Sequence, residues 1–523
     1  MARRTKLALL AILCVYTALF VRAVTYELVW DDIHEIAESP DYDAPLLDGA
    51  LETQTARNDA SLVETAKLQQ DYDSFRPLTF ASFWLEIRAW GRSPAPLHAT
   101  NLVLGALCTL LVFCLARRWV SDVAALCVTA LFAIHPMQVE AVVYVSARGD
   151  LLAALGALLC LAAVARANEA SARSSIVGWT AAAGVAFAAS VLAKESFACL
   201  PILVGVWLLL EGRLRGRWPV AVVLAAIAIG YLVVRSAVVH NTAGSVVASA
   251  ALALPGICVE YLRSFIAPFG LSTEQLHASA LTPIGIVLGA AALGGAAVAA
   301  WRRRSRELIA AVFGLCWVAI LVAPSCVPIV SSSVRADRYF YLPFAGLAVA
   351  IVAIVARLLD ARPRIRRPAF AIAGIWLVVL LFISWRQVAV WRTNETLYVN
   401  AVTMTPESSM ANYRIGYLYA THDQWAEAAA YFESAIARDP DNALALNNLG
   451  VMFMRQGDYR SAVAPLARAT RANPGHFRAW LNLALSELQL GEHEQGCAHI
   501  QRALAINPGY TTARAEWQQR CAR

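Results

Sequence analysis

Residues 441–474 read DNALALNNLGVMFMRQGDYRSAVAPLARATRANP, and the last of them, Pro474, is one of four prolines spaced 34 residues apart. Small residues and large apolar residues recur in phase with these prolines. The prolines are Pro406, Pro440, Pro474 and Pro508; the small residues are Gly416, Gly450, Ala484, Ala428, Ala462 and Gly496; the large ones are Phe432, Leu466 and Ile500. A fixed period of this length indicates that one helical unit is repeated along the C-terminal part of the chain.

The period and the phased pattern are those of the tetratricopeptide repeat, a pair of antiparallel helices. Small residues allow the two helices of a unit to cross closely, and large apolar residues fill the groove between neighbouring units. We expect full repeats at about 407–440, 441–474 and 475–508, with half a repeat before them and a capping helix after them. Residues 392–523 are therefore predicted to form an α-solenoid.

The chain before this region is far more apolar. Of all 523 residues, 59% are hydrophobic and only 15% are charged, whereas soluble domains carry about a quarter charged residues. Eleven apolar runs are long enough to approach the length of a membrane span. They fall near 7–24, 98–116, 121–136, 149–166, 175–193, 196–211, 218–239, 282–300, 307–324, 338–357 and 368–388. The sequence predicts an all-α fold, in which a polytopic membrane domain of about eleven spans (1–391) precedes the solenoid.

Arginine clusters occupy every second loop between the apolar runs, beginning with Arg117 and Arg118. By the positive-inside rule such loops face the cytoplasm. The N-terminus is then cytoplasmic, and residues 25–97 and 392–523 lie on the outer side. That side would be the periplasm or cell exterior of a bacterium, or the ER lumen of a eukaryote. Because the net charge of +7 records membrane orientation, it does not point to a nucleic-acid partner.

Most of the 11 cysteines lie inside apolar runs, where cysteine is typically a small packing residue. No CxxC pair occurs, so zinc and thioredoxin-type sites have no support. Cys497 and Cys521 fall on consecutive helices of the expected solenoid, at similar distances from the Pro508 turn. In an oxidising outer compartment this pair would form a disulfide; two unpaired thiols are the alternative.

The run Trp30-Asp31-Asp32-Ile33-His34 directly follows the first apolar run. Such carboxylates serve either to cap a helix or to act as a general base on a substrate delivered by a membrane lipid. Adjacent residues face different ways, so we expect one carboxylate to point at a site and the other to support it. Further polar groups predicted at the same membrane face are Arg76, Asn101, His135, Glu140, Arg148, Asp150, Lys194, Glu195, Arg335, Arg338 and Tyr339. Each alone is consistent with a structural ion pair, but their gathering on one face favours a functional site.

Six short motifs occur in a fixed order before the repeats. They are Trp-Asp-Asp-Ile-His at 30–34, Arg-Pro-Leu-Thr at 76–79, His-x-x-Asn at 98–101, His-Pro-x-x-x-Glu-Ala-Val at 135–142, Ala-Lys-Glu at 193–195 and Arg-Tyr-Phe-Tyr-Leu-Pro at 338–343. Over nearly the whole chain, this order resembles the transmembrane and tetratricopeptide-repeat-containing O-mannosyltransferases, a family of GT-C glycosyltransferases. The chain departs from that family in residues 37–75, which carry no motif we can place, and in its short array of three repeats.

The resemblance implies a polyprenyl-phosphate monosaccharide donor and a protein Ser/Thr acceptor, with inversion at the sugar. It implies Asp31 as general base, supported by Asp32 and His34. Lys194, Arg335, Arg338 and Arg76 are the candidates to bind the donor phosphate. The expected supporting residues are Asn101, His135, Glu140, Arg148, Asp150, Glu195 and Tyr339. Asp31, Asp32, His135 and Glu140 are suitable ligand types for a divalent metal, but no ligand spacing indicates one, and we predict no metal or other cofactor.

Asn448 and Asn482 occupy equivalent positions one repeat apart, on the helix expected to line the concave groove. Side-chain amides in such a row can bond an extended acceptor peptide without reading its sequence; ordinary surface polarity is the alternative. Two other functions remain open: a GT-C enzyme that glycosylates a lipid or cell-wall glycan, and a non-enzymatic scaffold that works through its repeats. A transporter is disfavoured because the ionisable groups gather on one face and no inverted repeat is evident.

Overall fold

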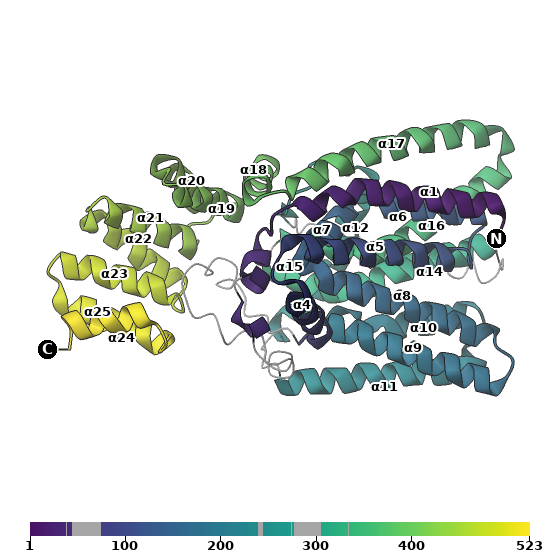
Figure 1. Cartoon of the computed structure of the whole chain (residues 1–523), viewed down its shortest axis with the longest axis horizontal. Coiled ribbons are helices and arrows are strands. Elements are labelled where there is room, and N and C mark those ends of the chain that lie inside the picture. The colour runs from purple at the N-terminus through teal and green to yellow at the C-terminus, as the bar shows by residue number, and fades with distance from the viewer. Residues whose placement is uncertain are drawn as a thin grey trace. The chain divides into compact units, whose positions relative to one another are not determined.

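The computed structural model describes residues 1–37, 39–43, 75–238, 244–273, 275–276, 305–332 and 334–522. The chain divides into two compact units, one formed mainly by residues before Asn394 and the other mainly by Asn394–Arg523. Both are helical (Figure 1). Within the described residues, the only strands are β1 Gln275–Leu276 and β2 Val334–Arg335, of two residues each. The predicted all-α fold is therefore confirmed.

In the first unit, nine helices of the described chain are long and apolar enough to cross a membrane. They contain α1 Arg3–Phe20, α5 Pro94–Ala116, α8 Arg148–Glu169, α9 Arg173–Ala193, α11 Leu214–Val238, α12 Gly244–Ile266, α14 Arg306–Val322, α16 Tyr341–Ala361 and α17 Arg366–Val390. A tenth span would combine α6 Asp122–Ile134 with Pro136–Val143, across a bend of 58°. Eight of the roughly eleven expected spans are thus found among the described residues, or nine with the bent pair, and α12 is an additional one.

The predicted spans differ from the observed helices in three places. The run expected at 282–300 lies outside the described residues. The run expected at 196–211 forms α10 Leu200–Leu210, which is shorter than the other spans. Conversely, α12 was not predicted as a span, because Pro255, Glu260 and Arg263 interrupt its apolar pattern. The long helices lie lengthwise beside one another (Figure 1).

Short elements connect these helices. They are η1 Val21–Thr25, η2 Ile33–Ala37, η3 Pro40–Asp43, α4 Pro77–Trp90, η4 Pro136–Gln138, α7 Val139–Val143, η5 Val145–Ala147, η6 Glu195–Cys199, η7 Ala323–Ser325, α15 Cys326–Ser332, η8 Asp337–Phe340 and η9 Pro363–Ile365. The bend between α6 and α7 falls at Pro136, whose ring cannot continue the hydrogen-bond ladder. It turns α7 out of the direction of α6.

Small residues bring the long helices into close contact. A Cβ atom on Gly156 of α8 would lie 2.8 Å from the carbonyl oxygen of Ala186 in α9. Likewise, a Cβ on Gly314 of α14 would lie only 2.3 Å from the carbonyl oxygen of Gly346 in α16. Because hydrocarbon offers helices no hydrophobic driving force to associate, such close backbone packing is a main source of their attraction in a membrane.

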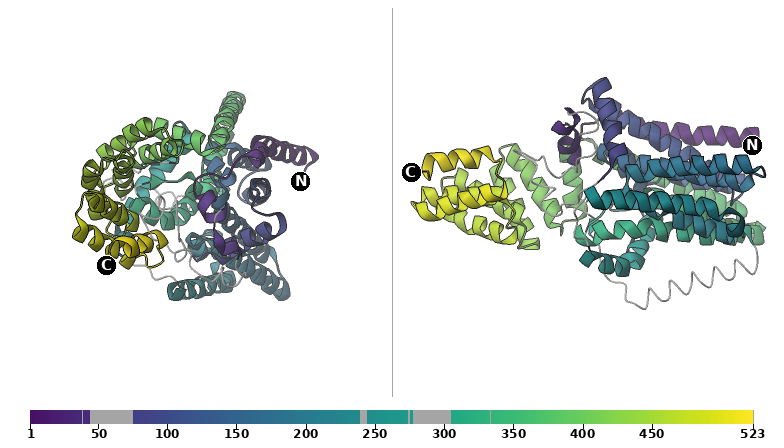
Figure 2. Two further views of the ribbon diagram at one scale, coloured as in Figure 1. Left: turned by 60° about the vertical axis from the view of Figure 1, so that its left-hand side comes forward. Right: turned by 90° about the horizontal axis from the view of Figure 1, so that it is seen from below.

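The second unit is a succession of antiparallel helices, stacked one pair after another (Figure 2). They are α18 Asn394–Met404, α19 Ser409–Thr421, α20 Trp425–Arg438, α21 Ala443–Arg455, α22 Tyr459–Ala472, α23 Phe477–Gln489, α24 His493–Ile506 and α25 Thr511–Arg520. The phased residues meet as expected. A Cβ on Gly450 would lie 2.4 Å from the Leu466 side chain, and Leu466 also packs against Leu483 of the next repeat.

A disulfide joins Cys497 of α24 to Cys521 just after α25, with the two Cα atoms 5.6 Å apart. The nine other cysteines are free. The bond ties the terminal helix to the last full repeat, at the end of the array where a helix has a neighbour on one side only.

We predict that Cys497→Ser lowers the local free energy of unfolding of α24 and α25 by about 3 kcal/mol, because it releases a loop of roughly two dozen residues. Hydrogen exchange of these two helices in the full-length protein measures this quantity. Reduction of the wild type should reproduce the effect, and Cys14→Ser, at a free exposed cysteine, should not. Unchanged protection in Cys497→Ser would contradict the disulfide.

Candidate functional site

The segment after η1 adopts an unusual backbone conformation. Trp30 has a φ angle of 57°, which is rare for a bulky residue and typical of strained positions at functional sites. Its indole stacks on the ring of Tyr144, with the ring centres 5.5 Å apart. The stack holds the strained turn in place, and the two acidic residues that follow it point to different surroundings.

Asp32 is fully buried. Its Oδ1 accepts hydrogen bonds from the backbone N–H and the hydroxyl of Ser146, both at 2.7 Å, and its Oδ2 accepts one from Val145 N–H at 3.3 Å. Burial raises the pKa of Asp32 to about 7, against the opposing effect of the hydrogen bonds from Ser146 and Val145. The residue fastens the Trp30 turn to the segment after α7, which fits the supporting role expected for one of the two carboxylates.

Asp31 is only half-buried. Its Oδ2 accepts a hydrogen bond of 2.9 Å from the hydroxyl of Tyr144. The two carboxylates therefore face different ways, and Asp31 is the more accessible of the pair. His34 lies in η2, but its side chain is outside what the structure describes.

Arg338 reaches the same aromatic pair from η8. Its guanidinium lies 5.5 Å from the centre of the Tyr144 ring and 5.8 Å from that of Trp30. An ion pair with Glu140 of α7 holds it there, and Glu140 also accepts a hydrogen bond from Asp337 N–H at 2.8 Å. A carboxylate and a cation thus lie against one aromatic group.

Two further cations come from α9 and α4. Lys194 Nζ lies 2.5 Å from Asp150 Oδ1 and 4.9 Å from the ring centre of Tyr339, which Arg338 also contacts at 5.1 Å. Burial lowers the pKa of Lys194, and Asp150 acts in the opposite direction. Arg76 makes two hydrogen bonds to Glu195, at 2.9 and 2.7 Å. Residues distant in the sequence therefore form one group, in which the cations Arg76, Lys194 and Arg338 are each paired with a carboxylate.

A buried network of an ion pair and hydrogen bonds holds the backbone of Tyr144 and Val145. Arg148 is fully buried and lies 2.5 Å from Glu86, while its Nε donates to Asn101 Oδ1 at 3.0 Å. Asn101 in turn donates to the carbonyl oxygens of Tyr144 and Val145, at 3.2 and 3.3 Å. Sequence reasoning missed Glu86 and Tyr144. A signal existed for Glu86, which is the single acidic residue of the apolar helix α4.

Arg335 and His135 contact another part of the unit. Arg335 donates to the Ser264 hydroxyl at 2.9 Å and lies 3.9 Å from Glu260, both in α12. His135 Nε2 lies 3.0 Å from the carbonyl oxygen of Phe265, and its ring packs against Phe265 and Phe344. Through these bonds, neither residue contacts Arg338, Lys194 or Tyr339. Throughout the described residues, no three His, Cys, Asp or Glu side chains are grouped as metal ligands.

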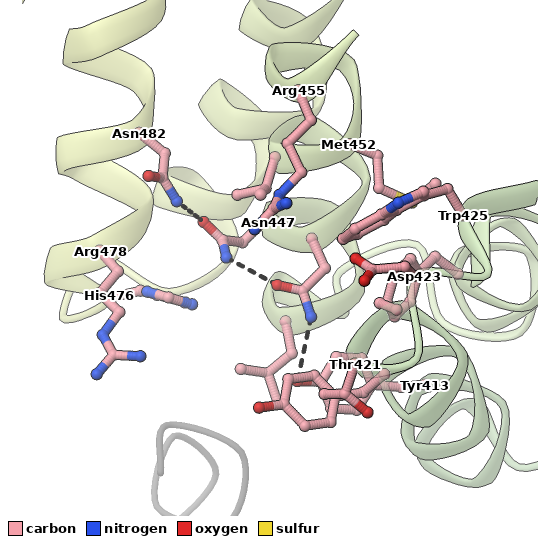
Figure 3. Close-up of a pocket in the computed structure, with 16 residues that line it drawn as sticks. Tyr413, Thr421, Asp423, Trp425, Asn447, Met452, Arg455, His476, Arg478 and Asn482 are labelled. Atoms are coloured by element: carbon pink, nitrogen blue, oxygen red, sulfur yellow. Dashed lines mark hydrogen bonds between the residues drawn. The ribbon is translucent and has the colours of Figure 1, made fainter. Parts of the chain in front are cut away.

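The second unit holds a cavity of about 440 Å³ lined by α19, α21 and α23 (Figure 3). Asn448 and Asn482 both line it, as predicted, and Asn447 links them. Asn482 donates to Asn447 at 2.9 Å, Asn447 donates to Asn448 at 3.2 Å, and Asn448 donates to the Tyr413 hydroxyl at 3.4 Å. We call these four residues the amide row. Trp425 with Arg455 stacked on its ring at 4.6 Å also borders the cavity.

Known proteins resemble both the C-terminal repeats and the apolar part of the chain. Residues 413–464 and 453–511 match a family model described as a tetratricopeptide repeat, which confirms the predicted repeats. The apolar part is outside this match.

Among curated proteins, the human protein O-mannosyl-transferase TMTC1 is 36% identical over 142 residues, 26% of this chain and 15% of the human one. Drosophila melanogaster Tmtc1 is 39% identical over 17% of this chain and 10% of its own. Caenorhabditis elegans protein O-mannosyl-transferase F38B6.6 is 22% identical over 75% of this chain and 56% of its own. The chain therefore spans little more than half of these relatives at most. The resemblance recognised from the motifs is confirmed, and the apolar helices are those of an integral membrane protein.

Among solved structures, the Archaeoglobus fulgidus oligosaccharyltransferase in its apo form aligns with 73% of this chain and 56% of its own, at a TM-score of 0.40 and 14% identity. This likeness is too distant to locate a site.

We predict that Asp32 makes the protein less stable as the pH rises from about 4 to about 7. Its folded-state pKa of about 7 exceeds its ordinary value of 3.8, so between these values the folded state binds more protons than the unfolded state. The slope is at most about 1.4 kcal/mol per pH unit. Asp32→Asn should remove this slope from unfolding curves of the purified protein, whereas Asp360→Asn, at an exposed carboxylate, should keep it. Parallel curves for wild type and Asp32→Asn would contradict the assignment.

Proposed function

We propose that the protein is a membrane glycosyltransferase that moves mannose from a polyprenyl-phosphate donor to Ser/Thr hydroxyls of proteins on the non-cytoplasmic side. The observation that supports this most directly is the meeting of Asp31 with Arg338 and Lys194 through the aromatic residues Tyr144 and Tyr339. The similarity to protein O-mannosyl-transferases supports the choice of sugar and acceptor.

The chemistry needs a base on one side of the sugar and cations on the other. A Ser or Thr hydroxyl is a poor nucleophile at neutral pH, so Asp31 takes its proton as the oxygen attacks the anomeric carbon. The bond from that carbon to the phosphate oxygen breaks, and its electron pair leaves with the polyprenyl phosphate. Arg338 and Lys194, with Arg76 beside them, stabilise the developing phosphate charge. Displacement in one step inverts the sugar.

The ion pairs of these cations are compatible with phosphate binding. A guanidinium has five N–H donors and an ammonium has three, so Arg338 and Lys194 can each bond a carboxylate and a phosphate oxygen together. Glu140 and Asp150 then serve to hold the cations in place before the donor arrives. Because the pairs are buried or nearly so, a phosphate entering this region would meet cations that are already oriented.

We further propose that the N-terminus is cytoplasmic and that the solenoid lies outside. The alternation of basic loops supports this orientation. The Cys497–Cys521 disulfide supports it independently, because disulfides persist in oxidising, extracytoplasmic compartments. In this orientation the amide row binds an extended acceptor peptide through its main chain.

We predict that Asp31→Asn lowers sugar transfer by a factor of about 10² or more, because the amide cannot accept the proton. The assay uses purified protein in nanodiscs, radiolabelled polyprenyl-phosphate mannose and a Ser/Thr-rich peptide. Asp360→Asn, which alters an exposed carboxylate paired with Arg366, serves as the matched control. Transfer by Asp31→Asn at the wild-type rate would rule out this base, and a wild type that binds no lipid-linked sugar would favour a scaffold.

We predict that Asn448→Ala and Asn482→Ala each weaken peptide binding by about 3- to 10-fold, the effect of losing one net hydrogen bond. Fluorescence anisotropy of a labelled peptide with the full-length protein measures the affinity. Asn507→Ala removes an amide that bonds only its own turn at Gly509 and should bind like wild type. If all three variants bound the peptide as tightly as the wild type, the acceptor would bind outside the amide row.

A further inference from the structure

Tyr144 contacts both the proposed base, Asp31, and the cation Arg338, but the proposed mechanism gives it no role. It directly follows α7, is 2% exposed, and donates its hydroxyl proton to Asp31 Oδ2 at 2.9 Å. Its ring packs against Trp30 and Trp391, whose ring centres lie 5.5 and 5.3 Å away and 6.4 Å from each other. Because both neighbours are bulky, the phenol ring has a fixed orientation.

The backbone of Tyr144 is fixed as firmly as its ring. Its N–H donates to the carbonyl oxygen of Glu140 at 3.0 Å, and its own carbonyl oxygen accepts from Asn101 at 3.2 Å. Asn101 is held in turn by Arg148, which is paired with Glu86. The network of Glu86, Arg148 and Asn101 is therefore bonded to the backbone of Tyr144. The Tyr144 hydroxyl in turn bonds Asp31.

The same ring also lies near the cation. Arg338 lies 5.5 Å from the Tyr144 ring centre and is paired with Glu140, four residues before Tyr144. One short helical turn thus holds both the carboxylate that orients the cation and the phenol that orients the base.

We propose that Tyr144 is a positioning residue for sugar transfer, an inference that rests on the proposed function. Its hydroxyl fixes the direction of the Asp31 carboxylate by donating a hydrogen bond to Oδ2. Oδ1 of Asp31 then remains to take the proton of the acceptor hydroxyl. The other charged groups nearby are Arg338 and Glu140 from η8 and α7, and Asp32, which faces Ser146.

The test is Tyr144→Phe, which keeps the ring, its stacking and its contact with Arg338, and removes one hydroxyl. We expect kcat to fall about 10- to 100-fold, as for the loss of a hydrogen bond to a charged group, with the KM for the lipid-linked sugar within about twofold of wild type. Tyr16→Phe, which removes a buried hydroxyl bonded to the Leu102 carbonyl at 3.1 Å, should change neither of these.

A second readout is independent of activity. Infrared spectra at a single pH, with Asp31→Asn subtracted in each background, isolate the carboxylate stretching band of Asp31. In Tyr144→Phe we expect this band to shift in frequency, because the carboxylate loses the hydrogen bond from the phenol. Coincident bands, together with an unchanged kcat, would overturn the inference while leaving transfer by the wild type intact. A wild type that transfers no sugar would instead overturn the proposed function, and with it the role of Tyr144 in transfer, even where the band shifts.

Discussion

The pairing of buried charges is the constraint on which the membrane unit depends. Four ion pairs join helix ends that are distant in the sequence: Arg76–Glu195, Arg148–Glu86, Lys194–Asp150 and Arg338–Glu140. The first pair is partly exposed and the other three are largely buried. A buried charge left unpaired costs several kcal/mol. The ends of α4, α8, α9 and α7 therefore meet in an arrangement that satisfies all four pairs together, and this arrangement also brings the cations to one place.

Asp31 differs from the carboxylates of these pairs. Among the described contacts, its hydrogen bond comes from a neutral phenol, whereas Glu140, Asp150 and Glu195 each hold a cation. The pairing that stabilises the fold engages those three carboxylates with cations. Asp31 is half-buried and holds no cation among the described contacts, which makes it the best candidate of these four for the base that we propose.

Much of this architecture could be predicted because it leaves a periodic or local trace. The 34-residue spacing of prolines indicated the solenoid, and loops on one side of the membrane indicated which polar residues would meet. The partners within the site could not be predicted. That Glu86 binds Arg148 depends on how α4 packs beside α8, and no pattern along the chain records that packing. Arg335 was assigned to the donor phosphate as a cation of the same outer turn as Arg338, and its contacts with Glu260 and Ser264 of α12 could not be predicted from that position.

The amide row has a direction. Each side chain donates to the next, from Asn482 through Asn447 and Asn448 to Tyr413, across three successive repeats. Such a chain of like-oriented donors polarises along its length. An extended polypeptide is also directional, since its amides and carbonyls alternate in a fixed sense. A strand bonded to this row would consequently be accepted in one N-to-C orientation and disfavoured in the reverse, so the solenoid would sort peptides by the direction of their chain without reading their sequence.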